Sequence, residues 1–186
     1  INECTEGIRR VRELAGLDAT RLRIGSLYSL TLRCIPQLLI GLKFRKPALQ
    51  IALTLGSNEQ LLASLNDGEL DAIVIGLQAP VDNKELVAVP LFEDEIRLAA
   101  PLGSPYSGRG KIDLQQMRAE NFITLGKGFV TFDSFQHAFR QAGFVPEATI
   151  QVGDIFSLIN LVSGGIGYSL LPARVSEFSS RMELIP

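Results

Sequence analysis

The pattern that most constrains the fold is a double alternation of strand and helix signals between residues 22 and 76. Residues 22–25, 49–55 and 71–76 are short apolar runs of the kind that form buried strands. Leucine and isoleucine residues at helical spacing fill the two stretches between them. This order predicts a parallel sheet with right-handed crossovers. Ligands of such sheets bind at the carboxyl ends of the strands.

The second half of the chain repeats the alternation without repeating the sequence. Helix patterns at 131–142 and after Asp154 separate the strand patterns, and extended or turn-rich segments link the two halves. The strands expected here are 96–100, 122–125, 149–152, 168–172 and 182–185. We therefore expect an α/β chain of two lobes with a cleft between them, each lobe a mostly parallel sheet flanked by helices.

Composition argues against several classes of function. The formal net charge is -2 and the sequence pI is about 5.5, so no basic excess favours nucleic-acid binding by this segment. No run approaches the roughly 20 apolar residues of a membrane-spanning helix. Cys4 and Cys34 lack metal-ligand spacing, and His137 is the single histidine. We expect reduced thiols, a cytoplasmic protein, and neither metal nor cofactor.

A catalytic site is not expected either. Asp133, Ser134 and His137 could share one face of a helix, but three polar neighbours on an amphipathic helix are typically a solvated face. The chain contains no metalloprotease, nucleophile-elbow or P-loop motif. We expect that this protein is not an enzyme.

Small hydroxyl residues recur where a strand pattern gives way to a helix pattern. Such side chains can cap a helix, or they can share its free N–H groups with an anion. Capping is the simpler interpretation for any one of them, and Ser57 with Gln60 has the spacing of a capping box. Several such ends meeting at one cleft would instead indicate an anion site. These residues are Ser26, Ser29, Ser57 with Asn58, Thr124 and Thr131, and Asp154 is expected to cap the helix that follows it.

The amino-terminal segment carries a narrow apolar stripe. Residues 1–15 place apolar side chains three and four positions apart, as in a helix–helix seam. Two heptads are too few to separate a seam from an ordinary surface helix.

The motifs, taken in order, resemble one family. Leu22–Gly25, the strand at 49–55, Gly68–Ile73, Pro90–Ile96 and Val162–Pro172 together resemble the effector-binding domain of LysR-type transcriptional regulators. The resemblance implies the two-lobed type II periplasmic-binding-protein fold over nearly all of residues 21–186.

The resemblance also implies a division of the chain. Residues 1–20 would end a linker helix, 21–85 with 178–186 would form lobe I, and 86–177 would form lobe II. The winged helix-turn-helix domain that contacts operator DNA would lie outside this chain, which would continue past Pro186 with a further strand and helix. A homodimer or homotetramer is expected, with contacts through helices near 28–45 and 131–142.

The family carry-over, joined to the strand-end pattern, gives a candidate effector site. A narrower resemblance of residues 23–32, 56–58 and 152–159 to malonate-utilisation regulators of this family implies a small carboxylate effector, specifically malonate. Lys127 and Arg33 could balance its charge. A transporter's solute-binding protein and an enzyme on the same fold are the alternatives. The candidate residues are Ser26, Ser29, Ser57, Asn58, Lys127, Gly128, Phe129, Thr131 and Asp154.

Overall fold

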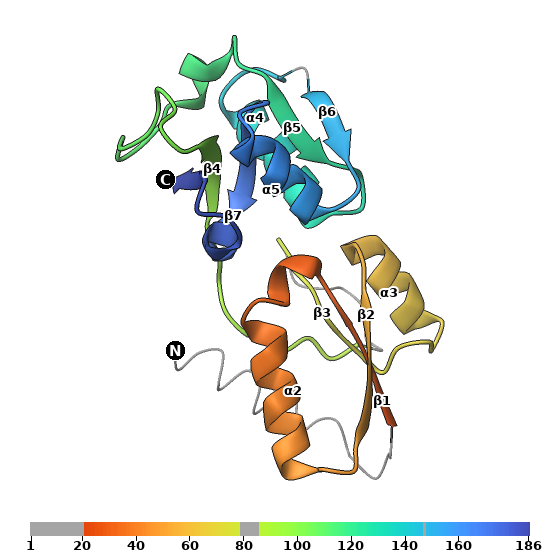
Figure 1. Ribbon diagram of the computed structural model, residues 1–186. Coiled ribbons are helices and arrows are strands. Elements are labelled where there is room, and N and C mark those ends of the chain that lie inside the picture. Colours follow the sequence, from red (N-terminus) through yellow and green to blue (C-terminus); the bar gives the residue numbers. More distant parts are fainter. Residues whose placement is uncertain (1–20, 79–85, 147) are drawn as a thin grey trace. The chain divides into compact units, whose positions relative to one another are not determined.

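The computed structural model describes residues 21–78, 86–146 and 148–186 (Figure 1). The chain divides into two compact units, Ile1–Glu93 and Asp94–Pro186, and each unit is described by itself. The expected helix at 1–15 and the turn-rich segment at 79–85 lie outside the described residues.

The first unit is a three-stranded parallel sheet with the order β2-β1-β3. This is the parallel sheet that the strand–helix alternation predicts, with β1 in the centre. Figure 1 shows α2 and α3 packed beside the sheet. The elements of this unit are β1 (Arg21–Ser26), η1 (Tyr28–Leu30), α2 (Cys34–Arg45), β2 (Gln50–Leu55), α3 (Asn58–Asn66) and β3 (Ala72–Val74).

Central strand β1 and helix α2 supply most of the core of the first unit. Leu22 and Ile24 of β1 are buried together with Leu38 and Leu42 of α2. Pro36 is the third residue of α2, within the first turn, where its missing N–H costs no internal hydrogen bond.

Gly25 allows α3 to approach the sheet closely. A Cβ atom at this position would lie 2.6 Å from Leu70 Cδ1 and 2.8 Å from Leu61 Cδ2, so no larger residue fits without displacing both leucines.

Strand β3 is shorter than the expected 71–76, because it is an edge strand that pairs with β1 over only three residues. Beside it, Arg23 donates to Asp71 from its backbone N and from its guanidinium, with the shortest contact at 2.6 Å.

The second unit combines parallel and antiparallel pairing. Strand β5 pairs with β6 in parallel, whereas β4 runs antiparallel to both β7 and β8. A parallel bridge between Phe122 and Tyr168 joins β5 to β7. The elements are β4 (Ile96–Pro101), η2 (Leu114–Met117), β5 (Phe122–Leu125), α4 (Val130–Gln141), β6 (Ala148–Val152), α5 (Ile155–Ser163), β7 (Ser169–Pro172), η3 (Ala173–Phe178) and β8 (Met182–Ile185).

The end of the chain lies in the second unit, which differs from the predicted division. Residues 178–186 were assigned to lobe I, but β8 pairs with β4 in the register Leu98↔Ile185 to Pro101↔Met182. The boundary between the units also falls after Glu93 and not before residue 86. The physical reason is local, because Leu91 still packs against the core of the first unit.

An aromatic cluster fills the core of the second unit. Phe122 is fully buried, and its ring centroid lies 4.7 Å from that of Phe139 and 5.9 Å from that of Phe135, both in edge-to-face geometry. Tyr168 and Tyr106 extend the cluster. Phe135 and Phe139 therefore hold helix α4 on the sheet.

We expect Phe122→Ala to lower the free energy of unfolding of the second unit by about 3–5 kcal/mol, because the change leaves a cavity among the rings. Leu102→Ala is the control, since Leu102 is 64% exposed in the second unit and its removal should change stability by less than about 0.5 kcal/mol. Urea unfolding followed by circular dichroism measures both. Equal losses in the two variants would contradict the assigned core.

Candidate functional site

The carboxyl ends of β1, β2 and β3 meet at one edge of the first sheet. Ser26 is opposite Leu55 in the register, Gly56 N donates to Ser26 O at 3.2 Å, and Leu27 N donates to Val74 O at 3.2 Å. The four candidate residues of this unit, Ser26, Ser29, Ser57 and Asn58, lie at this edge or in η1 directly after it.

Ser57 caps α3 as the spacing predicted. Its Oγ accepts a hydrogen bond from Gln60 N at 3.2 Å, and Gln60 Oε1 accepts one from Ser57 N at 3.0 Å, which completes a capping box. Accepting this bond leaves the hydroxyl proton of Ser57 available to donate. Ser57 is thus both a cap and a potential ligand donor.

Ser26 and Ser29 do not cap helices. The Ser26 hydroxyl donates to Leu27 O at 3.1 Å, and Ser29 is buried inside η1, which begins without a side-chain cap. Thr124 in the second unit repeats the arrangement of Ser26, because its Oγ1 donates to Leu125 O at 3.2 Å. The buried hydroxyls of Ser26 and Thr124 therefore donate their hydrogen bonds to the local backbone.

Asn58 fixes the first turn of α3 to the end of β3. Its Nδ2 donates to the carbonyl oxygen of Gly76, which sets the orientation of the amide. Its Oδ1 is buried and has no hydrogen-bond partner among the described residues. Asn58 therefore serves the fold through its amide nitrogen.

Helices α4 and α5 begin at neighbouring strand ends in the second unit. Strands β5 and β6 are parallel, and Gly126 N donates to Val152 O at 3.1 Å where they end. Residues 126–129 then lead into α4, with Gly128 at a φ of 92° that favours glycine. Gly153 and Asp154 lead into α5.

The start of α4 carries no side-chain cap, which corrects the expectation that Thr131 caps it. The N-cap residue is Phe129, two positions earlier, and no described side chain accepts from the N–H groups of Val130 and Thr131. The next two N–H groups, of Phe132 and Asp133, donate to Phe129 O. Thr131 lies in the first turn, is 7% exposed, and its hydroxyl makes no hydrogen bond with any described residue. Lys127 is exposed in the preceding turn. This end of α4 thus presents unused donors.

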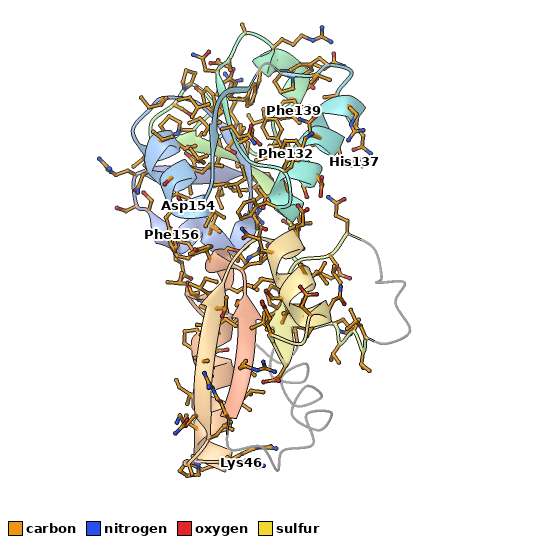
Figure 2. The ribbon with its side chains drawn as sticks, turned by 90° about the vertical axis from the view of Figure 1, so that its right-hand side faces the viewer. Lys46, Phe132, His137, Phe139, Asp154 and Phe156 are labelled. Carbon is orange, nitrogen blue, oxygen red and sulfur yellow. The ribbon has the colours of Figure 1, made fainter. Side chains whose placement is uncertain are left out.

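Asp154 caps the start of α5. Its Oδ1 accepts from Ser157 N at 2.9 Å, and its Oδ2 accepts from Ser157 Oγ at 2.7 Å. These hydrogen bonds hold the pKa of Asp154 below its usual value. The ionised form of Asp154 is therefore favoured, and both carboxylate oxygens bond its own helix, at whose start Figure 2 labels the residue.

The groups considered for other chemistry are not brought together. Ser134 Oγ donates to Val130 O at 3.0 Å, and His137 is exposed at the outer side of α4, away from Asp154 (Figure 2). Within residues 21–78, 86–146 and 148–186, no cluster of three potential metal ligands is present. No helix in those ranges is both long and apolar enough to span a membrane.

A family model described as the LysR substrate binding domain matches residues 15–186. The chain belongs to the LysR substrate-binding domain family. The fold is the two-lobed type II periplasmic-binding-protein-like fold of LysR regulators, as the motif order implied.

Known proteins add more specific likenesses to this LysR domain. The malonate utilization transcriptional regulator of Klebsiella pneumoniae is 43% identical over 178 residues, which are 95% of this chain and 58% of that protein. The CcmR regulatory domain of Synechocystis PCC6803, solved in complex with 2-PG, aligns with a TM-score of 0.77 at 24% identity over 89% of this chain and 79% of that one. The QuiR effector-binding domain, solved with shikimate, aligns with a TM-score of 0.71 at 18% identity over the same shares. The two structural likenesses show the fold alone.

We expect Asp154→Ala to destabilise the LysR domain by about 1 kcal/mol, because α5 loses its cap. Asp154→Asn keeps an acceptor and should retain most of that stability. The folded-state pKa of Asp154 is lowered, so its ionic contribution is present above the unfolded pKa of about 3.9 and is lost as the pH falls through the folded value.

Thermal unfolding of the three proteins between pH 7 and pH 3 checks this assignment. The stability advantage of the wild type over Asp154→Asn should shrink below about pH 4. An advantage that persists unchanged at pH 3 would contradict the ionised cap.

Proposed function

We propose that the chain is the effector-sensing domain of a LysR-type transcriptional regulator and that its effector is a small dicarboxylate, specifically malonate. The observation that carries the proposal is the 43% identity to a malonate utilization transcriptional regulator over 95% of the chain. The chain spans 58% of that relative's length, so operator DNA binding is proposed for a part of the regulator outside these residues. The cytoplasmic location stays a prediction.

The start of α4 supports a carboxylate as the bound group. An uncapped helix end offers backbone N–H donors together with the positive end of the helix dipole, and both favour an anion. The Thr131 hydroxyl, which makes no hydrogen bond with a described residue, adds a second kind of donor, and Lys127 adds a positive charge that needs no fixed geometry. The start of α5 is unsuitable, because the ionised carboxylate of Asp154 already occupies it.

The first unit offers candidate donors for the second carboxylate of a dicarboxylate effector, with less direct support than the start of α4. The Ser57 hydroxyl retains a proton to donate while it caps α3, whereas the Ser26 hydroxyl donates to Leu27 O and has only acceptor capacity left. We therefore rank Ser57 above Ser26 as an effector contact, and Ser29 is retained from the family resemblance. The cleft between the lobes stays a prediction.

The proposal gives a regulatory mechanism in thermodynamic terms. An effector that binds one arrangement of the two units more tightly than others shifts the population toward it. The shift cannot exceed the difference between its binding free energies for those arrangements. The relatives are transcriptional regulators, which favours this mechanism over transport or catalysis.

Calorimetric titration of malonate tests the site on α4. Thr131→Val keeps the shape of the side chain and removes its hydroxyl, so we expect the affinity for malonate to fall about tenfold or more. Ser134→Ala is the matched control, because the Ser134 hydroxyl donates to Val130 O within the same helix and should not contact the effector.

Succinate and acetate serve as ligand controls in the same titrations, and both should bind the wild-type domain more weakly than malonate. Absence of heat from every dicarboxylate, with the domain folded, would refute the proposed effector class. An equal loss of affinity in Ser134→Ala would remove the role of Thr131.

We also propose that this domain forms a dimer through the exposed face of α2. Ile40 is 70% exposed and Phe44 is 88% exposed, and they are one helical turn apart on α2. Large apolar side chains adjacent on one face of a helix are typical of an interface. Lys43, Arg45 and Lys46 flank this face, and Figure 2 shows Lys46 at the tip of the unit.

We expect Phe44→Glu to weaken self-association at least tenfold, because it buries a charge in the proposed interface. Leu102→Glu is the matched control, since Leu102 is 64% exposed in the second unit, outside this face. Sedimentation equilibrium measures both. A dimer of unchanged affinity in Phe44→Glu would place the interface elsewhere.

A further inference from the structure

Gln151 is a polar side chain near the proposed effector site that makes no hydrogen bond with the described part of the chain. It lies in β6, opposite Thr124 of β5 in the register, one residue before the strand ends at Val152. Its neighbours Ile150 and Val152 are at least partly buried, whereas Gln151 is exposed. No described residue forms a hydrogen bond with its amide.

The amide of Gln151 lies beside Gly126, in the connection that leads from β5 to α4. A Cβ atom added to Gly126 would meet Gln151 Nε2 at 3.1 Å and no other atom within 4 Å. The glycine therefore leaves the space that the amide occupies. Gly126 is the first residue of the connection from β5 to α4, so the amide is held at the start of that connection.

Two independent features of α4 indicate that this amide would contact an anionic ligand. The helix is 12 residues long and begins without a side-chain cap, so its first N–H groups are available to bind an anion. Thr131 in its first turn is 7% exposed, and its hydroxyl makes no hydrogen bond with a described residue. Gln151 Nε2 is a third type of donor near this end of the helix, and it is uncharged.

We propose that Gln151 is a specificity-determining residue of the effector site and that its Nε2 donates a hydrogen bond to an effector carboxylate bound at the start of α4. The inference rests on the proposed function and deepens it. A neutral amide donor stabilises a carboxylate by a charge-assisted hydrogen bond without the broad attraction of a cation, so it selects ligands by geometry.

A charge series at position 151 tests the proposal by titration of the chain with malonate. Gln151→Ala removes the donor and should lower the affinity about tenfold or more. Gln151→Glu places a carboxylate against the ligand and should lower it further than the alanine change. Gln151→Lys restores a donor with positive charge, so it should bind malonate more tightly than Gln151→Ala does.

Gln141→Glu and Gln141→Lys make the same charge changes at the exposed carboxyl end of α4 and should leave the affinity unchanged. Thermal unfolding should give similar midpoints for all variants, which separates a contact from a structural role. Equal affinities across the position-151 series, with malonate bound by the wild type, would overturn the role of Gln151 and leave the proposed function standing. A wild-type chain that binds no dicarboxylate would overturn both.

Discussion

Parallel pairing of neighbouring strands is the constraint on which the candidate site depends. In a parallel pair both strands end at the same edge, so the segments that follow them start side by side. The β1–β2 pairing brings Ser26 next to Gly56 and Ser57, and the β5–β6 pairing brings Gly126 next to Val152. Residues about 30 positions apart in the chain thereby share one edge in each unit. The helices that follow begin at that edge with their N–H groups unpaired unless a side chain bonds them.

The distribution of helix caps then decides which of these edges can take an anion. Helices α3 and α5 are capped by Ser57 and Asp154, and Asp154 adds a negative charge of its own. Helix α4 has no side-chain cap, and the donors around it include Thr131 and Lys127. The second unit therefore contains both a capped and an uncapped helix start, α5 three residues after β6 and α4 five residues after the adjacent β5. This difference gives the proposed effector site a physical basis beyond likeness to relatives.

The sequence predicted features that arise from neighbouring residues better than features set by long-range pairing. The Ser57–Gln60 capping box and the Asp154 cap follow from residue spacing alone, and both are confirmed. The cap at Thr131 was wrong because the exit of β5 through Gly128 starts α4 earlier. The end of the chain was assigned to lobe I, since nothing local in residues 182–185 specifies pairing with β4. Gln151 was missed for the same reason, because only the register with β5 brings it to Gly126.

The most direct measurement of the central claim is a malonate titration of the ¹⁵N-labelled chain followed by the backbone amide signals at the starts of α4 and α5. An anion bound at an uncapped helix end accepts hydrogen bonds from its first N–H groups and shifts their resonances. The account predicts saturable shifts for Val130 and Thr131 and much smaller ones for Phe156 and Ser157, whose helix start is filled by Asp154. Saturable shifts at Phe156 and Ser157 with none at Val130 and Thr131 would contradict it.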